Sequence, residues 1–298
     1  MNKEIAGTIL ALLTALVSGI AIPVNKIFVV DIDPVVFTAV RALIIGVIFL
    51  VLSLLMNKSK QSIVNWKYLL AIAIIGGSFA FLLFFSGLQL TTSGHAAFLH
   101  KTLPLYVAIF AFLILKEKIT KRYLSAMFLM LFGTIAIYSV SISPAELWLN
   151  PQLGDLLIIG ATILWAAENV IARKAMINGE TNFIVSFARM FFGGLILFGV
   201  VLLTNKFGIL LSLTTSQIIN ISISVVILFL YVLFYYWALK FINASKAAVL
   251  LLLAPVVSLI IGVTILNEPF PLLQLAGSVL ILIGAYFIIG IKSEQRAV

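Results

Sequence analysis

Ten apolar runs, each about twenty residues long, constrain the fold of this chain more than any other feature. The hydrocarbon core of a bilayer is about 30 Å thick and takes roughly 20 apolar residues per helix, and backbone groups in lipid must be hydrogen-bonded within their own segment. With 63% hydrophobic and 10% charged residues, the chain has too few charges to cover a soluble surface. The pattern predicts an all-α polytopic membrane protein with ten transmembrane helices, near 5–24, 34–56, 66–88, 94–115, 121–140, 155–176, 182–204, 217–239, 245–266 and 270–291.

Basic residues lie almost entirely on one side of these predicted spans. If the N-terminus is cytoplasmic, the outer segments hold only Lys26 and Lys206, and three further cations, Arg41, Lys101 and Arg189, lie within spans. All other Lys and Arg residues then lie inside, as is usual for cytoplasmic loops. The sequence therefore predicts a multi-pass protein of the cell (cytoplasmic or inner) membrane with both termini in the cytoplasm.

The net charge of +9 indicates contact with the lipid bilayer and not with nucleic acid. Basic residues fall between apolar runs and form no basic helical face, so we expect them to meet anionic headgroups. The chain has no cysteine, and neither of its two histidines has a second ligand at metal spacing. We expect no metal site, no cofactor and no nucleic-acid partner, and nothing in the sequence fixes an oligomeric state.

The stretch from Ala238 to Ile289 has an earlier counterpart in the same chain. It aligns with residues 87–138 at a constant offset of about 151 residues. The matching pairs are Pro104 and Pro255, Glu117 and Glu268, and Gly133 and Gly284. The first parts of the two copies align at an offset of about 148 residues, which pairs Arg41 with Arg189. The chain is therefore predicted to contain two copies of one unit.

Five predicted spans per copy is an odd number, so the two copies must enter the membrane in opposite orientations. Transporters use such inverted repeats to open alternately to either side of the membrane around a site near its midplane. The expected organisation is a first five-helix repeat at 1–140, an extracytoplasmic linker at 141–154, a second five-helix repeat at 155–292 and a cytoplasmic tail at 293–298.

The run ALKFINASKAA at 238–248, followed by Pro255, Asn-Glu-Pro at 267–269 and Gly284, with its weaker first copy, resembles a known family. It is similar to the drug/metabolite transporter superfamily, and within it to the ten-span transporters with two EamA repeats. The resemblance implies a cytoplasmic-membrane carrier, often an exporter of amino acids or related metabolites. It also implies a central cavity lined by the first, third, fourth, sixth, eighth and ninth spans.

The two copies differ most at three polar positions. The first copy has His95, His100 and Lys101, where the second has Lys246, Leu251 and Leu252. Polar groups at this depth are unusual for this helix in the family, so the difference indicates a substrate unlike that of a typical member.

Ionisable side chains inside a span cost roughly 2.5–3.5 kcal/mol and are functional candidates by default. Glu168 is the only acidic residue well inside a predicted span. It is either a proton-coupling or amine-binding carboxylate, or a structural partner of Arg41, Arg189 or Lys101. Lys101, near mid-depth, either holds a substrate carboxylate or neutralises Glu168. Pro104 follows one turn later and should loosen the local hydrogen bonds.

The remaining charged candidates have mirrored or peripheral positions. Arg41 and Arg189 serve either as anion clamps or as structural charges that lock each gate. His95, near the outer rim, is expected to lie at the membrane interface. The side chain of His100 should project from a different face of the helix than that of its neighbour Lys101. Glu117 and its counterpart Glu268 are expected to cap neighbouring helices.

Aromatic and amide side chains complete the set of candidates. The spacing of four residues places Tyr231 and Tyr235 on one helical face, and Trp165 lies one turn before Glu168. Such aromatics either line a cavity or pack against helices and lipid. The predicted substrate-binding residues are Lys101, Glu168, Asn169, Trp165, Tyr231, Tyr235, Asn25 and Gln89.

These observations predict a secondary active transporter, not an enzyme, that moves a small organic metabolite by alternating access. The resemblance favours export of an amino acid or related compound. The predicted spans hold three cations but only one carboxylate, so a carrier of organic acids or sugar phosphates is the alternative prediction. The sequence has no Gly-rich nucleotide-binding loop, so a proton or substrate gradient is the remaining energy source. A membrane enzyme that acts on lipid and a scaffold protein are more remote alternatives.

Overall fold

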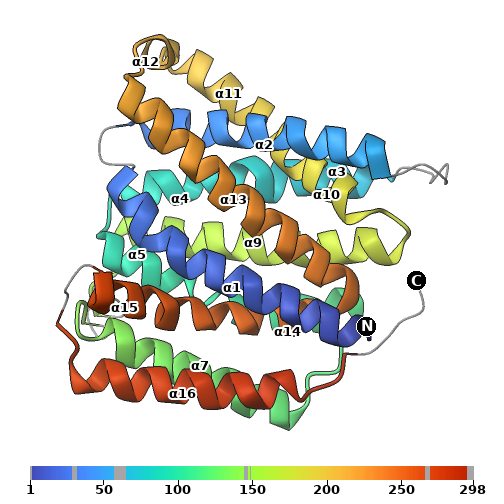
Figure 1. Cartoon of the computed structure of the whole chain (residues 1–298), viewed down its shortest axis with the longest axis vertical. Helices are drawn as coiled ribbons and strands as arrows, with labels where there is room; N and C mark the ends of the chain where they lie inside the picture. The colour runs from blue at the N-terminus through green and yellow to red at the C-terminus, as the bar shows by residue number, and fades with distance from the viewer. Residues whose placement is uncertain are drawn as a thin grey trace.

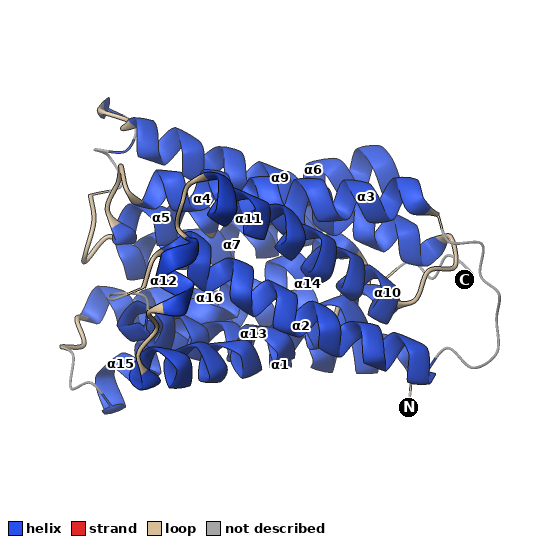
Figure 2. Cartoon of the chain, turned by 90° about the horizontal axis from the view of Figure 1, so that it is seen from above, coloured by secondary structure: helices blue, strands red, loops and turns tan. Residues whose placement is uncertain are grey.

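A computed structural model describes residues 2–28, 32–56, 65–143, 147, 149–265 and 269–293; of these, the side chains of 22, 23, 25–27 and 93 are not described. Within this part the regular structure is helical (Figure 2). The elements are α1 Lys3–Phe28, α2 Pro34–Met56, α3 Trp66–Ile74, η1 Ile75–Phe79, α4 Ala80–Leu88, α5 Ser93–His100, α6 Leu103–Phe110, η2 Ala111–Leu115, α7 Lys121–Tyr138, α9 Leu153–Ile177, α10 Asn182–Phe187, η3 Ala188–Phe192, α11 Gly193–Leu203, α12 Phe207–Leu211, α13 Thr215–Phe241, α14 Ala244–Leu250, η4 Leu251–Leu253, α15 Ala254–Ile265 and α16 Leu272–Ile289.

Nine helical segments in the described part are long and apolar enough to cross a membrane. The tenth span is α7. It is less apolar than the other nine because Lys121 and Arg122 lie in its first turn. It packs along α16 (Figure 1). Large apolar side chains such as Leu54, Phe132 and Leu282 are exposed on the outside of the bundle, where only lipid could cover them. The chain is an all-α polytopic membrane protein, and the predicted fold class is confirmed.

Two of the predicted spans are broken next to prolines. The fourth ends its first helix at His100 and makes a turn at 101–102 before α6 begins. Pro104, in the first turn of α6, has no N–H to donate to the preceding turn. The ninth span has the corresponding irregularity, because η4 separates α14 from α15 just before Pro255. The two halves therefore share this break as well as their sequence pattern.

Contacts between the halves follow an approximate twofold relation. The fifth spans of the two copies, α7 and α16, pack together, and so do the second spans, α2 with α10 and α11. The first span of each copy packs on the third of the other, α1 on α13 and α9 on α4. This reciprocal packing is the arrangement expected of two inverted five-helix repeats.

Glycines allow close approach at the α7–α16 contact. A Cβ built on Gly133 would lie 2.5 Å from the carbonyl oxygen of Gly277, and one on Gly284 would lie 2.9 Å from that of Ala126. The offset of about 151 residues converts the first pair into the second. Small residues at such positions let backbones of membrane helices pack directly on each other.

Replacing Gly133 with valine should therefore separate α7 from α16. We expect Gly133→Val to lower stability by about 1–3 kcal/mol, the usual cost of overpacking, because backbone atoms of Gly277 cannot rotate away. Thermal unfolding of the protein in detergent measures the loss. Gly199→Val is the matched control, since no atom lies within 4 Å of a Cβ built there. Equal melting temperatures for the two variants would contradict the packing.

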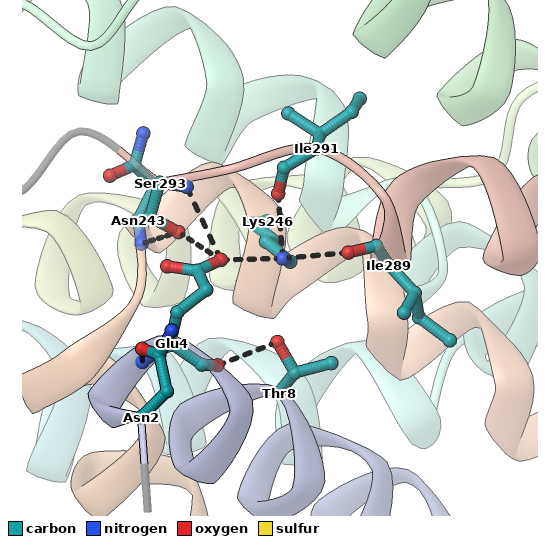
Figure 3. A network of polar contacts seen from close by, with 8 residues as sticks. All are labelled: Asn2, Glu4, Thr8, Asn243, Lys246, Ile289, Ile291 and Ser293. Carbon is teal, nitrogen blue, oxygen red and sulfur yellow. Dashed lines mark hydrogen bonds and ion pairs between the residues drawn. The ribbon is translucent and has the colours of Figure 1, made fainter.

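The two ends of the described chain meet at one face of the bundle (Figures 1 and 3). The backbone N–H of Ser293 donates to Glu4 Oε1 at 3.2 Å, and the Ser293 hydroxyl lies 3.1 Å from the same oxygen. We call this end the N-terminal face. An even number of spans requires this placement of the ends.

Candidate functional site

A cavity of about 280 Å³ lies within the bundle, where the two halves meet. Its wall comes from α1, α2, α4, the α5–α6 break, α9, η3 and α13, which include spans from both copies. The volume is close to that of pockets that hold small metabolites. The wall differs from the expectation in two respects. The second and seventh spans contribute to it through Arg41 and Arg189, and the ninth span contributes none of the residues that line it.

Most of the residues predicted from the sequence meet in this wall. They are Arg41, Lys101, Trp165, Asn169, Arg189, Tyr231 and Tyr235. They come from five spans far apart in the sequence, and nothing but the fold brings them together.

Three predicted residues lie elsewhere. Glu168 is fully buried behind the wall. Gln89 is exposed just after the end of α4, because the helix finishes at Leu88 and the side chain follows the chain out of the bundle. His95 lies near the end of the bundle opposite the N-terminal face, beside Asp155. The side chain of Asn25 lies outside the described residues.

The turn at 101–102 brings two neighbouring side chains to the cavity. An unbroken helix would point His100 and Lys101 in different directions, as the sequence suggested, but α5 ends at His100 and both residues line the wall. The His100 ring lies 5.0 Å from the Trp165 ring, centroid to centroid. Two features of the sequence are the signal for this position. The first copy has His100 where the second has Leu251, and Pro104 follows within about one turn.

Lys101 has a buried position and no side-chain partner. It is 9% exposed and lines the cavity, and its ammonium makes no hydrogen bond or ion pair within the described residues. A lysine so far from either face cannot reach water outside the bundle. Its charge is therefore directed at whatever occupies the cavity.

Arg41 is held by neutral groups alone. Its Nη1 donates to Ser224 Oγ at 2.7 Å and its Nη2 to Thr38 Oγ1 at 3.2 Å. Its Nε donates to the carbonyl oxygen of Phe37 at 3.3 Å, and the guanidinium lies 3.9 Å from the centroid of that ring. These contacts fix the side chain without cancelling its charge, since no carboxylate pairs with it in the described part of the chain.

Glu168 and Arg189 form a buried ion pair. Arg189 Nε lies 3.6 Å from Glu168 Oε2, and the two side chains are 8% and 0% exposed. The Tyr236 hydroxyl donates to the other carboxylate oxygen. Trp165 Nε1 donates to the carbonyl oxygen of Gly76 at 3.1 Å, beside the same carboxylate. Of the three intramembrane cations, Arg189 is thus the one whose charge is compensated.

The cavity consequently carries an excess of positive charge. Arg41 and Lys101 line it without a carboxylate partner among the residues that the structure describes, and the Arg189 charge is balanced by Glu168. In a low-dielectric bundle such an excess attracts anions strongly.

A polar network closes the N-terminal face (Figure 3). Lys246 Nζ donates to Glu4 Oε1 at 2.6 Å and to the carbonyl oxygens of Ile291 at 2.7 Å and Ile289 at 3.2 Å. It joins the starts of α1 and α14 to the end of α16. We call Glu4, Lys246 and Ser293, with these carbonyl groups, the terminal network.

A second set of contacts reinforces this end of the bundle. The Glu117 carboxylate accepts from the N–H of Ala244 at 2.8 Å and from the N–H and hydroxyl of Ser245 at 3.2 and 2.5 Å. These are the unsatisfied donors at the start of α14. Glu117 therefore caps a neighbouring helix, whereas the matching expectation for Glu268 lies outside the described residues.

The opposite face has polar contacts of its own among the described residues, and Asp155 accepts a hydrogen bond from the Thr91 hydroxyl there at 2.5 Å. His95 occupies the position that corresponds to Lys246, but its Nδ1 lies 3.5 Å from Asp155 Oδ1 and makes no hydrogen bond. Asp33 and Lys206 form an ion pair at 2.7 Å. Burial alone would raise the pKa of the Asp33 carboxyl, but the hydrogen bonds from Lys206 and from backbone N–H groups outweigh it and lower that pKa.

Comparison with known proteins gives a consistent result. A model of the EamA-like transporter family matches residues 5–139 and 152–290. An uncharacterized transporter of Bacillus subtilis, YyaM, is 30% identical over 206 residues, which are 68% of this chain and 66% of that protein. A second from the same organism, YetK, is 25% identical over 98% of this chain and 89% of its own length. A solved crystal structure that is 16% identical shares the fold, with a TM-score of 0.77 over 96% of this chain and 97% of that one.

Proposed function

The chain belongs to the EamA-like transporter family, and from this we propose that it is a secondary active transporter, which moves a small organic metabolite across the cytoplasmic membrane by alternating access. The observation that carries the proposal is the cavity between two inverted halves, lined by ionisable and aromatic side chains from both. The N-terminal face is closed by the hydrogen bonds of Lys246, whereas His95 Nδ1 at the corresponding position makes none within the described residues, and this difference further supports the proposal. Inverted repeats exchange such closures during transport.

The orientation follows from the loop charges. We place the N-terminal face in the cytoplasm, because the loops on that side carry nearly all the basic residues outside the spans. The expected direction is export, which the resemblance noted in the sequence favours.

The first candidate substrate class is amino acids and related metabolites. Lys101 supports it, because a free ammonium in the wall can hold a substrate carboxylate. The second candidate is a carrier or exchanger of anionic substrates, such as organic acids or sugar phosphates. The specific observation in its favour is the excess positive charge of Arg41 and Lys101 in the cavity.

Uptake into proteoliposomes tests the proposal. Purified protein is reconstituted and offered a panel of amino acids, organic acids and sugar phosphates at two pH values. Saturable uptake of at least one compound, inhibited by its unlabelled form, is expected. Uptake no faster than in protein-free liposomes for every compound would refute the proposed function.

The proposed role of Glu168 is to bind the proton that drives transport. A proton on Glu168 would neutralise its charge and free Arg189 to interact with the cavity, whereas its loss would restore the ion pair. Glu168→Gln imitates the protonated form and keeps a hydrogen-bonding partner for Tyr236. We expect this variant to lose the stimulation of transport by a pH gradient while counterflow without a gradient continues. An unchanged pH dependence of transport would exclude Glu168 as the proton carrier.

A further inference from the structure

We infer that the ligand of this cavity is an organic anion with an apolar or aromatic body and no ammonium group, held by Lys101 and Arg41 at its charged end and by the rings around Trp165 along its body. The inference rests on the proposed transport function and narrows it to the second of the two substrate classes, the organic anions. It separates organic acids from the amino acids that share their carbon skeleton.

The first step concerns the charged end of the ligand. Lys101 brings an ammonium with no partner in the described part of the chain, and the guanidinium of Arg41 is held only by neutral oxygens. A buried charge without a counterion is costly. An anionic ligand in contact with these two side chains supplies the missing counter-charge, and hydrogen bonds between ionised groups are roughly twice as strong as those between neutral ones.

The second step concerns an ammonium on the ligand. Among the described residues, the wall of the cavity contains no carboxylate. Glu168 is behind it and fully buried, with one oxygen bonded to Tyr236 and the other facing Arg189. An ammonium in the cavity would therefore meet cations and no anion, and like charges brought together in a low-dielectric site repel strongly.

The third step concerns the body of the ligand. The Trp165 ring packs within 5.1 Å of Phe81 and 5.3 Å of Phe84, centroid to centroid. Its N–H is already bonded to the carbonyl oxygen of Gly76, so the indole offers apolar surface. Tyr231 and Tyr235 stack at 5.9 Å in the same wall. Such rings pack favourably against an apolar or aromatic group.

Four probes that share a phenyl ring test the inference: 3-phenylpropanoate, L-phenylalanine, phenethylamine and 3-phenylpropanol. Binding is measured by tryptophan fluorescence with the full chain in detergent, with Trp66, Trp148 and Trp237 replaced by phenylalanine, so that Trp165 is the sole tryptophan. We expect 3-phenylpropanoate to bind at least about tenfold more tightly than the other three, because it alone offers a carboxylate without an ammonium. Lys101→Gln should raise its dissociation constant by about tenfold and leave that of the alcohol unchanged, which also shows that the variant is folded.

Several results would overturn the inference. They are binding of phenylalanine or phenethylamine as tight as that of the carboxylate, an unchanged dissociation constant in Lys101→Gln, and no binding of any probe. Tighter binding of glycerol 3-phosphate than of 3-phenylpropanoate would refute the apolar body. If the probes fail but another compound of the uptake panel is transported saturably, only this inference fails; if nothing is transported, the proposed function fails as well.

Discussion

Arg189→Met is expected to destabilise the folded protein by about 3–5 kcal/mol, the usual cost of removing one partner of a buried ion pair. The substitution leaves the Glu168 carboxyl fully buried and without its cation, with Tyr236 as its one hydrogen-bond partner among the described residues. Methionine fills a similar volume, so the loss reports the charge and not a cavity. Denaturant unfolding in micelles, followed by the fluorescence of Trp165 nearby, measures it.

The double variant Glu168→Gln/Arg189→Met is the control for this prediction. Because it removes both charges, it should recover most of the lost stability, as replacing both members of a buried pair often does. A double variant as unstable as Arg189→Met alone would show that the two charges do not depend on each other. The charge of Arg189 would then not be balanced by Glu168.

Lys246→Ala is expected to open the N-terminal face. It removes three hydrogen bonds from one ammonium, which join α14 to α1 and α16 (Figure 3). Hydrogen bonds to charged groups contribute about 1.5–3 kcal/mol each, and about 1.4 kcal/mol is a tenfold change in an equilibrium. The population open at this face should therefore rise about tenfold or more.

The chain is convenient for measuring this shift because it contains no cysteine. Ser18→Cys places a single thiol in the cavity wall. In the Lys246→Ala background, a membrane-impermeant thiol reagent should react faster from the N-terminal face and more slowly from the opposite face. Lys240→Ala is the matched control, since Lys240 is exposed in the last turn of α13 on the same side. Identical rates in both backgrounds would mean that the terminal network is not a gate.

The arrangement of the spans was predictable because it depends on patterns that lipid enforces. Apolar runs of fixed length gave the spans, and the repeat offset paired the halves, which the contacts of Gly133 and Gly284 bear out in detail. Irregular turns inside the spans were harder to predict from the sequence. Pro104 and Pro255 indicated two of them, but the π-helical turns η1, η2 and η3 contain no proline and have no comparable signal.

The site was predictable to the extent that its residues are unusual in a membrane. Lys101, Arg41 and Arg189 are conspicuous by their charge within apolar runs. Ser18 and Phe81 also line the cavity, but they are ordinary residues of membrane helices and nothing distinguishes them in the sequence. The partners of a charge were the least predictable feature. Glu168 had three candidate cations, and only tertiary packing selected one.

Protection of a cavity thiol by a transported compound tests the central claim most directly, which is that this cavity holds the substrate during transport. Ser18→Cys in proteoliposomes is treated with an impermeant thiol reagent while a compound that the protein transports is added in increasing concentration. We predict that labelling slows saturably, with half-maximal protection near the KM for transport of the same compound, and that Lys101→Gln raises both values together. A labelling rate that no transported compound changes would contradict the account.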